Sequence, residues 1–359
     1  MTGMRFASAV LLLIALTRTN VPVQAGGERL YELQGRVVQS NKKPWGEATP
    51  VVFLHGVLTP FHQKTFAESS GKFKFKNLRP GLYSVIVGIP MRGEMIRTID
   101  IGPTFADSKG RVSLDLTFEP AAPEEAKTVS AAALSIPGRA QDEYRKAQDR
   151  LARHDLAGAI VHLKKAVEFA PQFTAALNNL GTIAYQSRNY EEAEGYFRRA
   201  LEQDPDSYPP MVNLGGALLS GGKTQESLKY NLLAVRARPG DALARSQLGQ
   251  SYMLLGQTDL AETELKKAKA LDPGHFSFPQ LVLAEIYARR QEYSSAALEV
   301  EEFLKLHPDS DRAPNLRRIL EELRGKVKKC PAYFFAPAPS SSSVWRTDRH
   351  WNFSPIPRT

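Results

Sequence analysis

The spacing of hydrophobic positions changes once along this chain, from a period of two to a helical period. Between residues 33 and 118, apolar and polar residues alternate in short runs bounded by turn residues, as in Lys72-Phe73-Lys74-Phe75-Lys76. Such alternation places successive side chains on opposite faces of a strand. Six or seven runs of this kind within about 90 residues predict an antiparallel β-sandwich.

The second half of the chain has a fixed repeat. Five prolines stand at positions 171, 205, 239, 273 and 308, at spacings of 34, 34, 34 and 35 residues. A constant period of this length predicts an array of helix pairs. Small residues recur at two positions of each repeat, where they let the paired helices approach closely. They include Gly181, Gly215 and Gly249 in the first helices, and Ala159, Ala193, Ser227, Ala261 and Ala296 in the second. In the third repeat the polar Asn231 stands where an apolar packing residue is expected.

Two segments of the β region resemble a known family. Gly35-Arg36-Val37-Val38 comes first, and Ser70-Gly71-Lys72-Phe73-Lys74-Phe75 leads into Leu78-Arg79-Pro80-Gly81-Leu82-Tyr83. These residues resemble the carboxypeptidase regulatory-like domain. The resemblance implies a transthyretin-like sandwich that serves as a non-catalytic appendage.

The repeats, over residues 140–310, resemble the tetratricopeptide repeat. The predicted fold class is therefore multidomain, an antiparallel β-sandwich followed by an all-α tetratricopeptide-repeat solenoid. The predicted order is a signal peptide at 1–25, a sandwich at 26–120, a linker at 121–138, five repeats at 139–310, a capping helix at 311–329 and a disordered tail at 330–359. Because the linker holds few large apolar residues, the two domains are expected to fold independently.

The N-terminus resembles a secretory signal. Arg5 precedes an apolar stretch at residues 6–16, and Ala25 completes a small-residue cleavage site. We therefore expect export to an extracytoplasmic location, periplasmic or secreted. No apolar run is long enough for a membrane-spanning helix, so none is predicted.

Charge and motifs exclude several functions. The net charge is +9, but residues 139–325 carry 25 basic and 26 acidic side chains, so no basic stripe runs along the repeats. Nucleic-acid binding is therefore not expected. The single cysteine, Cys330, rules out an internal disulfide framework. No catalytic motif is found, so the prediction is a protein that is not an enzyme and has no cofactor or metal.

The inner groove of the repeats is the candidate site. In the tetratricopeptide family the first helix of each pair lines a concave surface, and Asn179, Asn213 and Gln247 occupy one register on successive repeats. Carboxamides offer donors and acceptors to the backbone of an extended peptide. The predicted peptide-binding residues are Tyr144, Gln148, Asn178, Asn179, Tyr185, Asn213, Gln247 and Gln250. The alternative is that the sandwich binds a glycan or cell-envelope component through exposed rings, with Trp45 as its only tryptophan.

Overall fold

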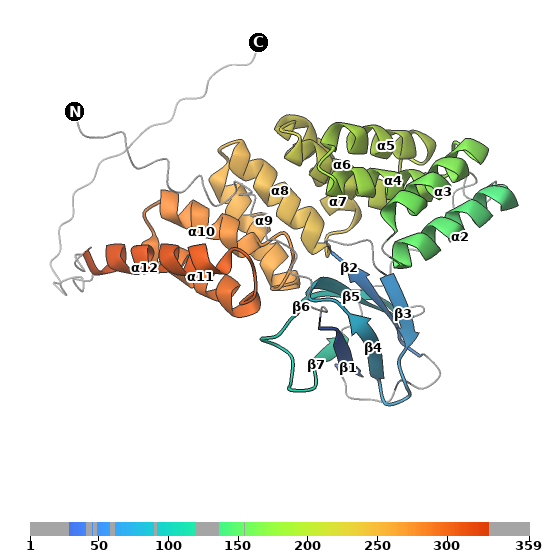
Figure 1. Ribbon diagram of the computed structural model, residues 1–359. Helices are drawn as coiled ribbons and strands as arrows, with labels where there is room; N and C mark the ends of the chain where they lie inside the picture. The colour runs from blue at the N-terminus through green and yellow to red at the C-terminus, as the bar shows by residue number, and fades with distance from the viewer. Residues whose placement is uncertain are drawn as a thin grey trace, which may run out of the picture.

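The structure is a computed structural model that describes residues 29–40, 45, 49–57, 62–89, 92–118, 136–153 and 155–329. They form two parts, a β-sandwich and a helical solenoid (Figure 1). The predicted signal peptide, most of the predicted linker and the predicted tail lie outside the described residues.

The sandwich consists of two sheets. The strands are β1 (Tyr31–Gln39), β2 (Val51–Gly56), β3 (His62–Phe66), β4 (Lys72–Leu78), β5 (Gly81–Ile89), β6 (Gly93–Ile101) and β7 (Arg111–Phe118). One sheet has the order β4-β1-β7 and the other the order β3-β2-β5-β6. The expectation of an antiparallel sandwich needs one correction, because β1 and β7 pair in parallel. These are the first and last strands of the domain, so no hairpin forces them to run in opposite directions.

The core of the sandwich follows the predicted alternation. Phe73 and Phe75 are buried between the sheets, whereas the lysines that flank them on β4 are exposed. Trp45 is also buried, and its Nε1 donates a hydrogen bond to the carbonyl of Val37 at 3.0 Å. Its ring meets that of Phe118 edge to face. The tryptophan therefore packs and closes the core rather than presenting a ring to solvent.

The solenoid is built from antiparallel helix pairs. The first helices of the repeats are α2 (Gly138–Ala152), α4 (Thr174–Gln186), α6 (Tyr208–Ser220), α8 (Ala242–Leu254) and α10 (Pro279–Arg289). The second helices are α3 (Leu156–Phe169), α5 (Tyr190–Gln203), α7 (Thr224–Ala237), α9 (Thr258–Leu271) and α11 (Tyr293–Leu306), and α12 (Ala313–Lys329) follows them. The large apolar residues of α12, such as Leu316 and Leu320, pack onto the last repeat, which leaves its polar face toward solvent.

In repeats two and four, one large side chain of the second helix fits against a small residue of the first. A Cβ placed on Gly181 would lie 2.5 Å from the ring of Phe197, and one on Gly249 would lie 2.6 Å from Leu265. Phe197 and Leu265 are fully buried. Gly181 and Gly249 therefore each leave a socket, a gap in the helix surface that a large side chain of the partner helix fills.

Repeat three fills the same socket with a polar group. Asn231 is fully buried, and its Oδ1 would clash with a Cβ on Gly215. Its Nδ2 donates to the hydroxyls of Ser227 and Ser251 at 2.9 and 3.0 Å, and Ser227 donates in turn to the carbonyl of Gly215. These bonds offset much of the cost of burying the amide. The two hydroxyls thus accommodate Nδ2 of Asn231, whereas its Oδ1 is buried with no hydrogen-bond partner among the described residues.

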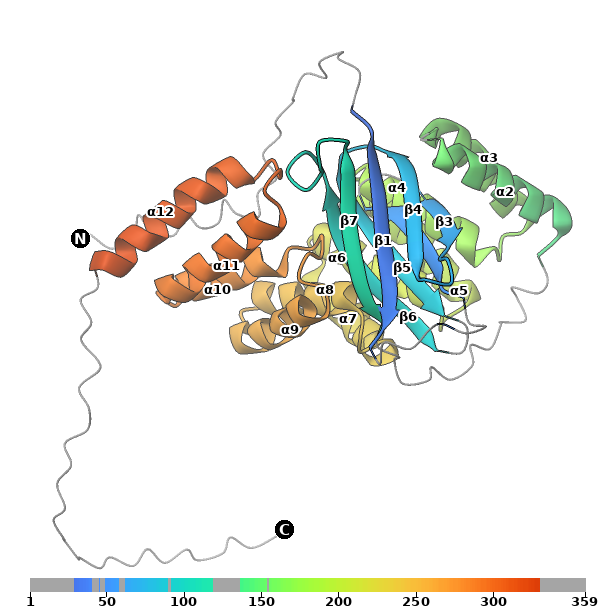
Figure 2. The same ribbon diagram turned by 90° about the horizontal axis from the view of Figure 1, so that it is seen from below.

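The sandwich lies across the arc of the solenoid, with α2 and α3 on one side and α10 to α12 on the other (Figure 2). At one end β3 approaches α2. At the other end β6 and the loop after it reach the loops that follow α9 and α11. The two domains therefore touch, and their independent folding stays a prediction.

Candidate functional site

The candidate groove lies on the inner face of the solenoid, which we define as the surface shared by α2, α4, α6, α8 and α10. All predicted peptide-binding residues lie on these helices. They are Tyr144 and Gln148 on α2, Asn178, Asn179 and Tyr185 on α4, Asn213 on α6, and Gln247 and Gln250 on α8.

Several of these side chains bind one another across adjacent repeats. Nδ2 of Asn179 donates to the hydroxyl of Tyr144 at 3.2 Å, and Nδ2 of Asn213 donates to Oδ1 of Asn178 at 3.0 Å. The hydroxyls of Tyr185 and Ser220 lie 3.0 Å apart. The structure therefore joins five of the eight predicted residues in hydrogen bonds between adjacent repeats, and these bonds also hold the first helices together.

Gln247 does not face open space. Its side chain is only 9% exposed, and a Cβ placed on Gly216 would lie 2.5 Å from its Nε2. Its Oε1 is buried without a hydrogen-bond partner. Nearby, Gln250 donates to the hydroxyl of Ser246 at 3.4 Å. The expectation that the three carboxamides in register all point into an open groove is therefore wrong for Gln247, because the two adjacent glycines of α6 leave a hollow that this side chain fills.

The first repeat retains an open hollow of about 460 Å³. The rings of Tyr144 and Phe173 form its apolar part, with centroids 4.8 Å apart. Burial raises the pKa of the Tyr144 phenol, which stays neutral and able to donate a hydrogen bond. The hollow is lined by Ile136, Gln141, Tyr144, Arg145, Gln148 and Phe173. Rings and amides thus surround this hollow.

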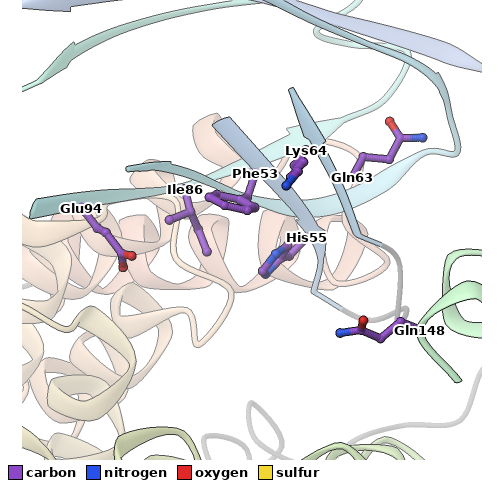
Figure 3. A pocket seen from close by; sticks show the side chains of 7 residues that line it. All are labelled: Phe53, His55, Gln63, Lys64, Ile86, Glu94 and Gln148. Carbon is purple, nitrogen blue, oxygen red and sulfur yellow. The ribbon is translucent and has the colours of Figure 1, made fainter. Parts of the chain in front are cut away.

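A second, larger cleft of about 610 Å³ lies between the solenoid and the sandwich. Gln148 lines it from α2, and the other six lining residues come from the sheet β3-β2-β5-β6 (Figure 3). They are Phe53, His55, Gln63, Lys64, Ile86 and Glu94. Because Gln148 lines both spaces, the hollow of the first repeat and the cleft meet at this residue.

Two of the lining residues, Phe53 and Ile86, belong to a row of apolar side chains on the sheet. Phe53 pairs with Ile86, and Ile86 pairs with Ile96 on the next strand. They alternate with the inward residues Val52 and Val85, so they stand on the outer face of the sheet. Their part in a cleft was not foreseen from the sequence. The available signal was the presence of apolar residues at positions where an exposed strand normally carries polar ones.

The free edge of the same sheet holds the sandwich to the solenoid, because β6 is the last strand in the order β3-β2-β5-β6. The backbone amide of Thr98 donates to Oδ2 of Asp272 at 2.9 Å, and Arg97 donates to the carbonyl of Leu271 at 2.9 Å. The hydroxyl of Thr104 donates to Oδ1 of Asp309 at 2.5 Å. These contacts join β6 and the loop after it to two consecutive inter-repeat loops of the solenoid.

Neither a metal-binding cluster nor a membrane-spanning helix is found among the described residues. Among them, no cluster of three or more histidine, cysteine, aspartate or glutamate side chains is arranged to hold a metal ion. No helix within these residues is long and apolar enough to span a membrane.

Comparison with known proteins identifies the helical part. Residues 150–218 and 242–275 match tetratricopeptide repeat families. The chain is 30% identical to the TPR repeat-containing thioredoxin TTL4 of Arabidopsis thaliana over 108 residues, which are 30% of this chain and 16% of that protein. It is 29% identical to the BBSome complex member BBS4 of Bos taurus over 147 residues, 41% of this chain and 28% of that protein. The chain thus spans less than a third of the length of these relatives.

A solved structure shows a similar partial likeness. MamA from Desulfovibrio magneticus RS-1 is 22% identical, with a TM-score of 0.44 over 49% of this chain and 99% of that one. The two family matches show that the solenoid contains tetratricopeptide repeats, a class of repeat that mediates protein–protein interactions and peptide binding. The resemblance of the sandwich to the carboxypeptidase regulatory-like domain stays a prediction from its residues.

Proposed function

We propose that this protein is an exported, non-catalytic interaction scaffold that binds an extended segment of a partner protein on the inner face of its repeats. The observation that carries the proposal is the open hollow of the first repeat, where Tyr144, Phe173 and Gln148 surround about 460 Å³. Rings supply apolar contact and amides pair with a peptide backbone. Of the predicted residues, Tyr144 and Gln148 line this space, whereas Gln247 is buried.

The test begins with selection of peptides from a random library on the full chain. The variant Gln148→Ala removes the side chain shared by the hollow and the cleft and leaves the buried core untouched. Loss of one hydrogen bond is worth roughly 0.5–1.5 kcal/mol, so affinity for a selected peptide is expected to fall about 2- to 13-fold. The matched control is Gln203→Ala at the exposed end of α5, which should bind as the unmodified chain does. Equal affinity for both variants would contradict binding at the first repeat.

Export is part of the proposal and rests on the sequence around Arg5 and Ala25. A mature chain that starts at Gly26 is expected after expression in a secreting host. Intact-mass measurement distinguishes it from a chain that retains residues 1–25.

The second candidate function is glycan or cell-envelope binding by the sandwich. Trp45 does not serve it, because that ring is buried and hydrogen-bonded to Val37. The rings available on the outer sheet face are Phe53, which lines the cleft, and Phe66, which is 62% exposed. A glycan array probed with the full chain and with Phe66→Ser tests this function. Binding that Phe66→Ser abolishes would favour the sandwich over the groove.

A further inference from the structure

We propose that the β-sandwich is a lid over the inner face of the solenoid, held closed by two carboxylate latches at Asp272 and Asp309. The proposal rests on the function proposed above, because the lid governs access to the same groove. It is carried by the contacts between the two domains.

The first latch is a deeply buried carboxylate. Asp272 ends α9 and is 2% exposed. It accepts a hydrogen bond from the backbone amide of Thr98, which is 4% exposed. Arg97 reaches the same loop through the carbonyl of Leu271 at 2.9 Å. Gly274 completes the fit, because a Cβ at this position would lie 2.9 Å from the carbonyl oxygen of Thr98. The strand and the loop therefore approach each other backbone to backbone.

The second latch repeats this arrangement one repeat further on. Asp309 follows α11, and its two carboxylate oxygens accept from the amide of Thr104 at 3.2 Å and from its hydroxyl at 2.5 Å. A Cβ on Gly102 would lie 2.8 Å from Oδ2 of Asp309. Both latches thus combine a carboxylate on the solenoid with a position where glycine permits close contact.

The latched sandwich faces the groove. Thr98 on β6 stands on the same outer sheet face as Ile86, since Thr98 pairs with Ser84 and Ile96 pairs with Ile86. That face lines the 610 Å³ cleft together with Gln148 of α2. The domain that the latches hold is therefore one wall of the cleft, which adjoins the proposed binding hollow at Gln148.

Among the described residues, the contact between the domains has no hydrophobic core to make it permanent. The buried apolar cluster of the sandwich draws its members from residues 31–118, and those of the solenoid draw theirs from residues 136–323. Within the described parts of the chain, no such cluster joins both domains. Small polar contacts between domains are the kind that open and close. Opening requires the release of two latches and leaves both domain cores intact.

A disulfide across the second latch tests the lid directly. A Cβ on Gly102 would lie 3.8 Å from the Cβ of Asp309, the average separation in disulfides of about 3.8 Å. In the full chain, Gly102→Cys and Asp309→Cys supply the disulfide, and Cys330→Ser removes the remaining thiol. Oxidation then locks the sandwich onto the solenoid, and reduction releases it. Small-angle scattering is expected to give a larger radius of gyration for the reduced chain than for the oxidised one. An equal radius in both forms would overturn the lid, whatever the groove binds.

Peptide uptake supplies the second readout. A peptide selected from the library is expected to associate at least tenfold more slowly with the oxidised chain, and reduction should restore the rate. Equal rates would overturn the lid. If neither form binds any peptide while the two radii differ, the groove function fails and the lid stands, so the two failures are distinguishable.

A point variant with a matched control removes dependence on the engineered disulfide. Asp272→Ala deletes the first latch, and Asp204→Ala deletes the aspartate at the same position of repeat two, where α5 ends with nearly identical backbone angles. Among the described residues no bond joins Asp204 to the sandwich. Only Asp272→Ala is expected to enlarge the radius of gyration and speed peptide association at unchanged helicity. Equal behaviour of the two variants would contradict the latch.

Discussion

The sandwich and the solenoid are stabilised in different ways. The sandwich has one continuous core, in which residues from Tyr31 to Phe118 meet between two sheets. The solenoid has several smaller clusters, each formed by neighbouring helices. A destabilising substitution in the sandwich affects the whole domain. One in the solenoid affects mainly its own repeat, because each repeat contacts only its neighbours.

The largest effect is expected from Phe197→Ala. Phe197 is 1% exposed and fills the socket at Gly181, so truncation leaves a cavity that costs about 3–5 kcal/mol. Amide hydrogen exchange should accelerate mainly in α4, α5 and α6. In the sandwich the counterpart is Leu54→Ala, at roughly 2–5 kcal/mol, which should accelerate exchange in all seven strands together. Faster exchange in only part of the sandwich, or throughout the solenoid, would contradict this difference between the two domains.

Gly215→Ala is expected to have an intermediate effect. The added methyl clashes with Oδ1 of Asn231, which is fixed by its bonds to Ser227 and Ser251. Overpacking of this kind costs about 1–3 kcal/mol. Denaturant unfolding monitored by circular dichroism measures the loss. Gly195→Ala on α5 is the control, since nothing lies within 4 Å of a Cβ at that position, and it should not destabilise the chain.

A smaller effect of opposite sign is expected at the turn inside the second repeat. Arg188 has φ of 62°, and the same turn in the next two repeats uses Gly222 and Gly256 at 80° and 77°. Glycine adopts this left-handed region without the strain that other residues carry. Arg188→Gly should therefore stabilise the chain by about 1 kcal/mol, and Gly256→Ala should destabilise it by a similar amount. Thermal unfolding of the two variants checks both signs.

The smallest effect concerns pH and the contact between the domains. Burial, and then the neighbouring Asp309, raise the pKa of Asp100 on β6 to about 6, and burial also raises the pKa of Asp272. Arg97 opposes the second shift. Burial lowers the pKa of His275, in the loop that contacts β6, to about 4, so this ring stays neutral between pH 5 and 7.

Docking of the sandwich therefore takes up a proton in this range. When the domains separate, the pKa of Asp100 returns toward its model-compound value of 3.8. The docked state is thus favoured below pH 6 and loses this advantage as the pH rises through 6. Scattering should show a smaller radius of gyration at pH 5 than at pH 7.5. Asp100→Asn should remove most of the difference, and an unchanged pH response in this variant would contradict the assignment.

Much of the fold was determined by short-range patterns in the sequence. The alternation around Phe73 placed β4 with its correct buried face, and the 34-residue period with Gly181 and Gly249 placed the helix pairs and their sockets. These features are local or strictly periodic, so each residue's role follows from the residues near it along the chain. The parallel pairing of β1 with β7 joins the two ends of the domain, and alternation carries no information about partners so far apart.

The site depended more heavily on the tertiary structure. The sequence placed Tyr144, Gln148 and the amides on one face, because helical periodicity dictates which residues share a face. Only the three-dimensional arrangement decided that Asn179 and Asn213 bind neighbouring repeats, and that Gln247 fills the space above Gly216. It also decided that the outer sheet face of the sandwich meets the solenoid. Asp272 and Thr98 are 174 residues apart in the chain, and no spacing rule connects a carboxylate in one domain to a backbone amide in the other.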